Sequence, residues 1–386
     1  MRVELLIVAI ALVACDGDRR APVGPVRFVH TFSPPEAAAL ADLLGGAEVE
    51  LTLLPFSRGE AVLGAALRRA ADCPDLIRID ATWLPALADA GLLRPPPPEL
   101  AERDWLPEAA ALATWRGALA AAPMSLDGLV LVRSASEPAP DGWPPGDLDA
   151  LEAMSRAASG PGRFGLGLRA DGYWLVPFLR ARGADVADGA RHTLGIDGPA
   201  AEAALAEMAA LYTDGVAAPA PAPGVEAERE AERFARGAIA ILATGPWAFP
   251  DLASMGADGL TGLTVDAWPG APRGGQLLAV PACAREPVRA WQLATSLTSP
   301  ATQAAWSRRL GTVPTTARGL AEAGPLARAT YTALAGARPL PQHPLSAALF
   351  DDLTPAVAAV VAGDATAGEA IAGVRRAWTR ALEAAP

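Results

Sequence analysis

The sequence contains no lysine, and all 32 of its basic residues are arginines. Against them stand 43 acidic residues, which give a formal net charge of −11. Such a chain lacks the basic surface that neutralises nucleic-acid phosphates, so we expect no DNA or RNA partner. The three histidines (His30, His192 and His343) are scattered, and neither a G-x-S-x-G nor an H-E-x-x-H motif occurs. We therefore expect no metal, no cofactor and no hydrolase of these classes.

Cysteines are also few, and the first of them follows a short apolar leader. The leader, MRVELLIVAIALVA, has one arginine before an apolar run that is too short to span a membrane. Its end, Leu-Val-Ala-Cys, resembles a bacterial lipobox, in which the cysteine is acylated. We predict a lipoprotein signal peptide (1–14), lipidation at Cys15 and a tether (15–25); the alternative is a buried N-terminal element. The mature protein would be periplasmic or on the cell surface, anchored by lipid, on the outer face of the inner membrane in a Gram-negative cell.

The length of 386 residues favours two domains. Strands and helices alternate from the first strand, VRFVHTF (26–32), through the third, DLIRID (75–80). A second unit of the same kind contains RFGLGLR (163–169) and GAIAILAT (237–244). This alternation predicts an α/β fold with a doubly wound sheet in each domain, parallel in the first. Two proline-rich stretches, 134–148 and 336–345, are interpreted as crossings between the domains.

The stretch IAILATGPWAFPDL (239–252) carries an apolar strand directly into a Gly-Pro pair. Gly and Pro both break regular structure, so Trp247 is predicted to lie in a turn just beyond the C-terminal end of the strand. Ligands of open α/β sheets bind at such ends. Trp247 is either a ligand contact or a core residue under a loop.

Several segments together resemble the extracellular solute-binding proteins of ABC importers, in the sugar-binding branch that includes maltose-binding protein. The resemblance covers nearly the whole mature chain, and the segments that carry it are FVHTFSPPEAAAL, PDLIRIDATWLPALADAGLL, PMSLDGLVLV, YWLVPFL, FARGAIAILATGPWAFPDL, GGQLLAVP, SPATQAAW and GTVPTT. It implies a two-lobed, type II periplasmic-binding-protein-like fold with a ligand cleft between the lobes. The implied lobes are an N-terminal one (26–126 plus 276–323) and a C-terminal one (129–275 plus 324–386). It also implies a monomer that delivers its ligand to a permease.

A sugar site needs carboxylates or amides for hydroxyl groups and aromatic faces for the ring. Polar and aromatic residues at strand ends and turns of the first lobe are the candidates: Thr31, Phe32, Arg58, Asp80, Trp83, Asp127, Gly275 and Gln276. Asp80 is either a helix cap or a ligand group, and Asp127 either a turn residue before glycine or a ligand group. Arg58 and Trp83 have equally ordinary alternatives, a solvated loop residue and a core residue.

The second lobe supplies the aromatic candidates by the same resemblance. Trp247 becomes a stacking platform, and Tyr173 matches a position that usually carries a cleft aromatic. Phe350 falls where relatives often have a stacking tryptophan. Trp174, beside Tyr173, is expected to point into the core.

The remaining two cysteines, Cys73 and Cys283, lie just before the third strand and just after the strand LLAVPA. In the family these two strands look antiparallel and adjacent, which places the start of one beside the end of the other. The resemblance therefore implies a disulfide in an exported protein.

Three other functions stay open. An exported enzyme acting on glycosides could use Asp80 and Asp127 as a carboxylate pair. The ligand could be a solute other than a sugar, such as a polyamine. The protein could also be a lipoprotein that senses its ligand without transporting it.

Overall fold

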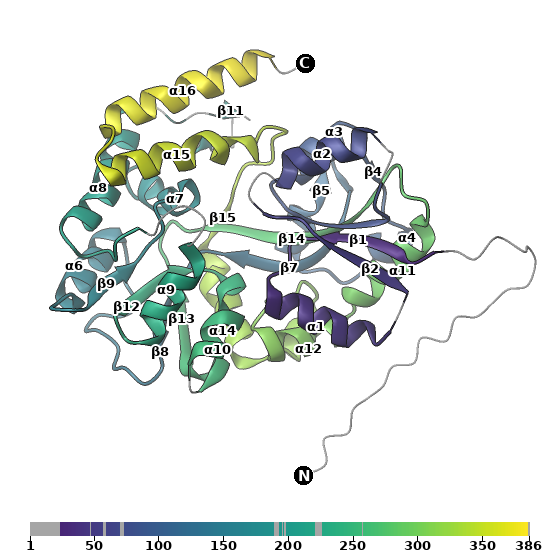
Figure 1. The fold of residues 1–386 in the computed structure, drawn as a ribbon, viewed down its shortest axis with the longest axis horizontal. Helices are drawn as coiled ribbons and strands as arrows, with labels where there is room; N and C mark the ends of the chain where they lie inside the picture. Colours follow the sequence, from purple (N-terminus) through teal and green to yellow (C-terminus); the bar gives the residue numbers. More distant parts are fainter. Residues whose placement is uncertain are drawn as a thin grey trace, which may run out of the picture.

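The computed structural model describes residues 24–46, 48–56, 59–69, 73–188, 193–194, 196, 198–220, 226–256 and 258–384. The predicted signal peptide, Cys15 and the candidate ligand residue Arg58 lie outside this part of the chain. Within it, no helix combines the length and apolar character needed to cross a bilayer. Two main sheets organise the chain into two lobes that lie end to end (Figure 1).

The first sheet has the strand order β2–β1–β3–β14–β7. Its strands are β1 (Val26–His30), β2 (Val49–Leu53), β3 (Leu76–Asp80), β7 (Ala122–Gly128) and β14 (Pro272–Pro281), with β4 (Leu93–Arg94) and β15 (Arg338–Pro339) paired to the ends of β14. As predicted, β1 runs parallel to β2 and β3. The sheet is nevertheless mixed, because β14 enters it antiparallel to both β3 and β7.

Helices cover both faces of this sheet. They are α1 (Pro34–Leu44), α2 (Gly59–Arg69), α3 (Leu84–Asp89), α4 (Pro98–Ala101), α5 (Pro107–Leu112), α11 (Pro287–Leu297), α12 (Pro300–Leu310) and α13 (Ala317–Ala321). Side chains alternate along each strand. Phe28 and Leu76 therefore join α1, α11 and α12 in one apolar cluster, whereas Ile77 joins α2, α3 and α5 in another. At the start of α1, the carboxylate of Glu36 accepts a hydrogen bond from the backbone N–H of Ser33 (2.9 Å).

The second sheet has the order β13–β8–β12–β9. Its strands are β8 (Val130–Ser134), β9 (Phe164–Gly167), β12 (Ile239–Thr244) and β13 (Leu263–Ala267), and its helices are α6 (Leu148–Ala158), α7 (Gly172–Ala181), α8 (Gly198–Thr213), α9 (Glu226–Ala235), α10 (Phe249–Met255), α14 (Pro325–Ala333), α15 (Ala348–Ala362) and α16 (Ala367–Ala384). Short elements complete the described chain: β5 (Thr114–Trp115), β6 (Ala118–Leu119), β10 (Ala187–Asp188), β11 (Thr193–Leu194), η1 (Pro246–Ala248), η2 (Gly259–Gly262) and η3 (Leu334–Gly336). Only β9 and β12 pair in parallel, since β8 is antiparallel to both β12 and β13. The second sheet is therefore mixed, like the first.

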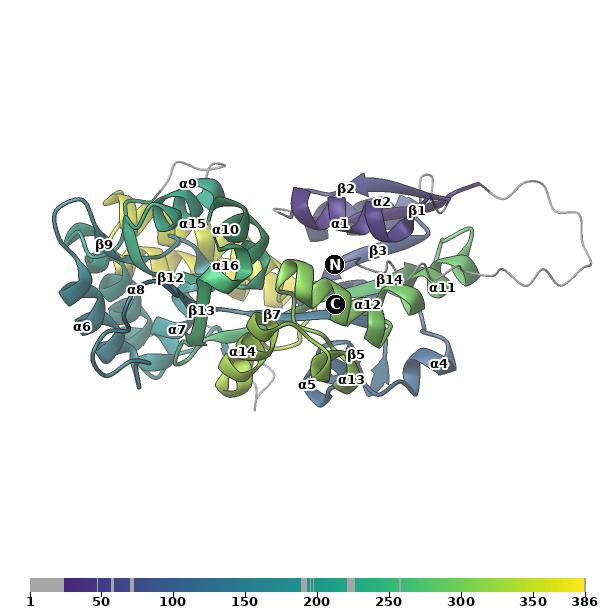
Figure 2. The ribbon, with the colours of Figure 1, turned by 90° about the horizontal axis from the view of Figure 1, so that it is seen from below.

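The chain first crosses between the lobes where β7 ends and β8 begins, and β14 brings it back (Figure 2). Gly128 makes the first crossing with a φ of +154°, and a Cβ there would lie 2.5 Å from the carbonyl oxygen of Pro272. The predicted crossing at 134–148 is wrong, because this stretch joins β8 to α6 inside the second lobe. Its proline-rich composition predicts a loop but does not specify what the loop connects.

The other proline-rich stretch, 336–345, runs from α14 to α15 along the junction of the lobes. Its β15 pairs with the start of β14. The side-chain amide of Gln342 donates to the carbonyl oxygens of Ala111 (3.1 Å) and Leu112 (3.0 Å) in the first lobe. These contacts tie the stretch to both lobes, and the residue boundaries of the lobes stay a prediction.

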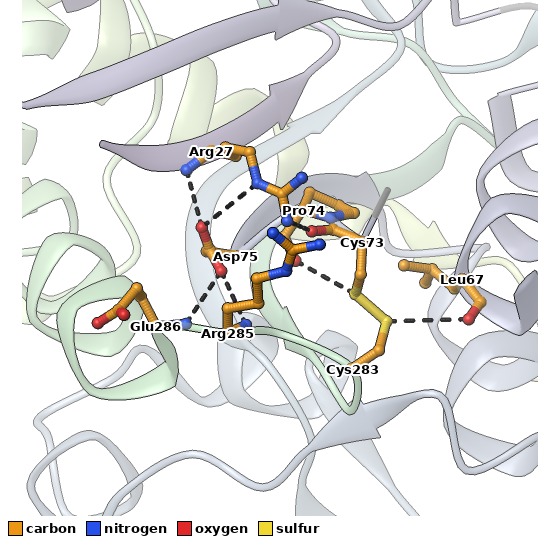
Figure 3. Close-up of a disulfide and its surroundings, with 8 residues drawn as sticks. All are labelled: Arg27, Leu67, Cys73, Pro74, Asp75, Cys283, Arg285 and Glu286. Atoms are coloured by element: carbon orange, nitrogen blue, oxygen red, sulfur yellow. Dashed lines mark hydrogen bonds and ion pairs between the residues drawn. A yellow bond between two sulfur atoms is a disulfide. The ribbon is translucent and has the colours of Figure 1, made fainter. Parts of the chain in front are cut away.

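Cys73 and Cys283 form a disulfide, with their Cα atoms 5.9 Å apart (Figure 3). Cys73 precedes β3 and Cys283 follows β14, and the antiparallel pairing of these strands brings the two positions together. The bridge joins residues separated by 210 positions in sequence. It therefore fastens the strand that returns from the second lobe to the middle of the first sheet.

A buried carboxylate supports the same place. Asp75 accepts hydrogen bonds from the backbone N–H groups of Arg27 (3.0 Å), Arg285 (2.9 Å) and Glu286 (3.0 Å) (Figure 3). These donors come from β1 and from the segment after β14, so Asp75 connects β1 with the start of α11.

Replacing both cysteines (Cys73→Ser with Cys283→Ser) is expected to lower the free energy of unfolding by about 2–5 kcal/mol, because the open chain gains conformational freedom when unfolded. Chemical denaturation of the oxidised protein and the double variant measures this difference. A reductant should destabilise the wild type by a similar amount and leave the double variant unchanged. Equal stability of the oxidised wild type, the reduced wild type and the double variant would show that the bridge contributes nothing.

Candidate functional site

Three polar side chains predicted to bind ligand meet on the first sheet. Asp80 ends β3, Asp127 lies near the end of β7, and Gln276 lies in β14 between these strands. The Nε2 group of Gln276 donates to Asp80 Oδ2 (3.0 Å) and to Asp127 Oδ2 (3.2 Å). An ionised carboxylate only accepts hydrogen bonds, so the amide must turn its NH2 group towards both aspartates. The register of β14 shifts directly after Gln276, an irregularity that re-aims side chains in a strand.

The turn after β3 fixes the orientation of Asp80. Its Oδ1 accepts hydrogen bonds from the backbone N–H (2.9 Å) and the hydroxyl group (2.6 Å) of Thr82. Burial raises the pKa of Asp80, while its hydrogen bonds to Thr82 and Gln276 and the charge of Arg78 act in the opposite direction. The two roles considered for Asp80 use different atoms: Oδ1 holds the turn and Oδ2 faces the amide.

Asp127 is the more deeply buried of the pair, with 8% of its surface exposed. Burial raises the pKa of its carboxyl group to about 7, and the nearby charge of Asp80 contributes to the rise. The hydrogen bond from Gln276 and the charge of Arg78 lower the pKa of Asp127 by less. The pair therefore carries less than its full negative charge at neutral pH.

The charge of Arg78 lowers the pKa of both aspartates, and Arg78 contacts two of the predicted residues, Thr31 and Phe32. Its Nη1 donates to the Thr31 hydroxyl (2.7 Å), and its Nη2 lies 3.4 Å from Glu36 Oε1. Its guanidinium group lies 4.4 Å from the ring centre of Phe32. Phe32 is 2% exposed and packs in the first-lobe core, so the structure places it beneath the site.

Three aromatic residues predicted for the second lobe also come together. Tyr173 begins α7, Trp247 lies in η1 directly after β12, and Phe350 lies in α15. The ring centre of Tyr173 is 6.3 Å from that of Trp247 and 5.9 Å from that of Phe350. The Tyr173 and Phe350 rings pack edge to face at 70°, and the Tyr173 and Trp247 rings are tilted by 60°.

The Gly-Pro pair before Trp247 has a direct steric reason. A Cβ at Gly245 would lie 2.2 Å from the indole ring of Trp247, so only glycine lets the ring fold back over the turn. Behind it, Trp174 is 4% exposed, and its Nε1 donates to the carbonyl oxygen of Ala243 (2.7 Å). Trp174 is thus a core residue that supports Trp247, and Trp247 remains partly exposed.

The aromatic group approaches the carboxylates at Gly274 of β14, and the next residue, Gly275, packs closely against β7. A Cβ at Gly274 would lie 2.8 Å from Asp127 Oδ1 and 3.6 Å from the hydroxyl oxygen of Tyr173. A Cβ at Gly275 would lie 2.6 Å from the carbonyl oxygen of Ser125. Burial, followed by the charges of the two aspartates, raises the pKa of Tyr173 well above its ordinary value, so its phenol is neutral at physiological pH.

Trp83 is a buried residue and does not offer an exposed ring face to a ligand. It is 4% exposed and packs under α2, where a Cβ at Gly59 would lie 2.3 Å from its ring. Its ring centre is 5.4 Å from that of Phe56, which is 56% exposed. Phe56 is the accessible aromatic of this corner and was missed in the sequence, because a single phenylalanine after a strand gives no signal of its exposure.

Acidic residues from the two lobes also face each other beside this corner. Burial raises the pKa of Glu60 in α2, Arg68 lowers it, and the charge of Asp351 in α15 raises it further. Asp351 directly follows Phe350. The first turn of α2 and the first turn of α15 thus bring like charges together across the junction.

The chain belongs to the family of bacterial extracellular solute-binding proteins, whose sequence profile matches residues 46–329. This membership confirms the resemblance read from the sequence segments. No curated protein sequence matches the chain.

Solved structures confirm the two-lobed fold. The GacH receptor of Streptomyces glaucescens, solved unliganded and with acarbose, is 25% identical, with a TM-score of 0.81, 94% of this chain covered and 99% of that chain. The maltose/maltodextrin-binding domain MalE of Bdellovibrio bacteriovorus, bound to maltotriose, is 16% identical (TM-score 0.80; 93% and 100% covered). The maltotriose-binding protein of Thermus thermophilus is 20% identical (TM-score 0.77; 92% and 100% covered).

The raised pKa of Asp127, about 7 against an ordinary 3.8, makes the unliganded protein sensitive to pH. Between these values the folded state keeps a proton that the unfolded state has lost, so stability falls as pH rises towards about 7 and then levels off. We expect the free energy of unfolding of the wild type, relative to Asp127→Asn, to fall by about 1 kcal/mol per pH unit between pH 5 and 7. Denaturation at pH 5, 6, 7 and 8 measures it, and parallel curves for the two proteins would contradict it.

Proposed function

We propose that this protein captures a sugar, a mono- or oligosaccharide, between its two lobes and delivers it to the permease of an ABC importer. The observation that carries the proposal is the division of the site: paired carboxylates and an amide on the first lobe, three aromatic rings on the second. A sugar presents hydroxyl groups at its rim and C–H faces above and below, and each half-site suits one of these. The structures with acarbose, maltotriose and, in a protein of Thermotoga lettingae, α-D-tagatose support this ligand class.

We assign the candidate residues from the sequence three different roles in binding the ligand. Asp80, Asp127 and Gln276 would bind hydroxyl groups, Tyr173, Trp247 and Phe350 would cover the ring, and Gly275 would let the ligand approach the backbone of β14. Thr31, Phe32 and Trp83 would support these contacts, and Arg58 stays a proposed hydroxyl donor.

Capture would proceed by closure of the lobes. A ligand that contacts both half-sites stabilises the closed arrangement over the open one by its extra contacts. The β7–β8 crossing at Gly128 and the start of β14 are the segments that would absorb the rotation. Affinity near micromolar, about 8 kcal/mol, is what such a site could supply.

The family consists of extracellular proteins, so the chain is an exported one. We propose that the signal peptide (1–14) is removed, that Cys15 is acylated, and that the monomeric protein works at the outer face of the membrane beside its permease. The proposed lobes are 26–126 plus 276–323 and 129–275 plus 324–386.

Trp247→Ala is expected to weaken sugar binding about 10- to 100-fold, because the ligand loses both ring stacking and burial. Titration calorimetry with maltose, maltotriose, acarbose and tagatose identifies a ligand and then measures the loss. Trp247→Phe should retain part of the affinity, and Trp115→Ala, in the β5–β6 pair, is the matched control that should bind normally. Unchanged affinity of Trp247→Ala would remove the residue from the site.

Cys15→Ala is expected to release the protein from the membrane, because the lipid would have no attachment point. Phase partitioning of cell extracts in Triton X-114 checks this. The wild type and the control Cys283→Ser should enter the detergent phase, and Cys15→Ala the aqueous phase. Detergent partitioning of Cys15→Ala would show that another feature holds the protein.

A further inference from the structure

Among the described residues, which do not include Arg58, the first-lobe half-site offers more hydrogen-bond acceptors than free donors. Both N–H groups of the Gln276 amide are engaged by Asp80 and Asp127. Gln276 is 8% exposed, and its Oε1 is buried without a hydrogen-bond donor among the described residues. The two carboxylates and this amide oxygen can therefore accept hydrogen bonds from a ligand that carries donor groups.

The described part of this half-site is also short of positive charge. Asp80, Asp127 and Glu36 are three carboxylates, and the cation that acts on all of them is Arg78. The Arg78 guanidinium is already committed to Glu36 and to Thr31. His30 adds no charge, because burial and the charge of Arg78 lower its pKa. Fully ionised, the cluster would carry two uncompensated negative charges.

The described residues of the facing lobe do not supply a cation to the pair either. Tyr173 faces the carboxylates with a neutral phenol, and Asp351 adds a negative charge opposite Glu60. The cation that acts on Tyr173 is Arg180. It is held by Asp185 (2.9 Å) and by backbone carbonyl groups that include that of Ala271 (3.1 Å).

We propose that the sugar captured by this protein carries a basic amine, and that its ammonium group sits between Asp80, Asp127 and Gln276 Oε1. This inference rests on the proposed function and names its substrate class. An ammonium group has three donors and no acceptor, which suits the unsatisfied amide oxygen and the two carboxylates, and its charge compensates the carboxylates. The rings of Tyr173 and Trp247 beside it would add cation–π attraction. A neutral sugar would supply donors without the charge.

The proposal predicts a proton released on binding. Burial and the charge of Asp80 raise the pKa of Asp127 to about 7, and an ammonium ion beside it would lower that pKa again. The other charged groups near the carboxylates, Arg78 and Glu36, form an ion pair with each other. A pH of 6.5 is below the ordinary pKa of an amine, so the ligand is charged. Asp127 would then lose its proton when the ligand binds.

The test is titration calorimetry of the full protein at pH 6.5 with glucosamine and its β-1,4-linked trimer, the corresponding glucose and N-acetylglucosamine compounds, and spermidine. We expect an amine-bearing sugar to bind at least tenfold more tightly than its neutral counterparts. Repeating the titration in buffers of different ionisation enthalpy should show proton release for the amine-bearing sugar and none for the neutral ones. This readout needs no variant, so it holds even if a substituted protein fails to fold.

Asp127→Asn then tests the position. It should reduce the preference for the amine to less than threefold and abolish the proton release, whereas Asp364→Asn, an exposed acidic residue beyond the end of α15, should change neither. Equal or tighter binding of neutral sugars would overturn this inference and leave the proposed function standing. Spermidine binding more tightly than every sugar, or no sugar binding at all, would overturn both.

Discussion

The amide of Gln276 joins two buried carboxylates that come from strands on either side of β14, and the rest of the site is arranged around this contact. A register slip of one residue would turn Gln276 to the opposite face of the sheet and leave both aspartates without their donor. The disulfide acts on the same strand pair from its other end, because Cys73 precedes β3 and Cys283 follows β14. The bridge and the amide together hold one register.

The same strand explains why the site needs two lobes. β14 leaves the second lobe, and its Gly274 has no side chain to separate Asp127 from Tyr173. Acceptors and charge then lie on one lobe, and neutral aromatic groups on the other. In the proposed function a polyhydroxylated ligand contacts both half-sites, so its binding energy would favour the arrangement in which the lobes close on it. The strand β14 thus contributes both to the candidate site and to the connection between the lobes.

The sequence predicted the alternating elements of the first lobe and the residues at its strand ends, because capping signals and apolar periods are local. Asp80, Asp127 and Gln276 were placed together by family resemblance, since strand order over 196 positions is not a local property. Local sequence could not predict that Phe32 and Trp83 are buried, because an aromatic residue after a strand can turn either way. Arg78, Phe56 and the approach of Glu60 to Asp351 depend on contacts between elements, and no motif announces them.

Asp127 and Asp80 are costly residues for the fold, because burial opposes their ionisation and each opposes the other. Apolar residues fill most buried positions on both faces of this sheet, and selection for stability alone would favour them at these two positions as well. Departures from local stability of this kind concentrate at functional sites. Here Arg78 reduces the unfavourable charge only in part, since Glu36 already pairs with it. The remaining imbalance lies at the point where the two lobes meet, so a guest that carries the opposite charge would stabilise the fold and the closed arrangement together.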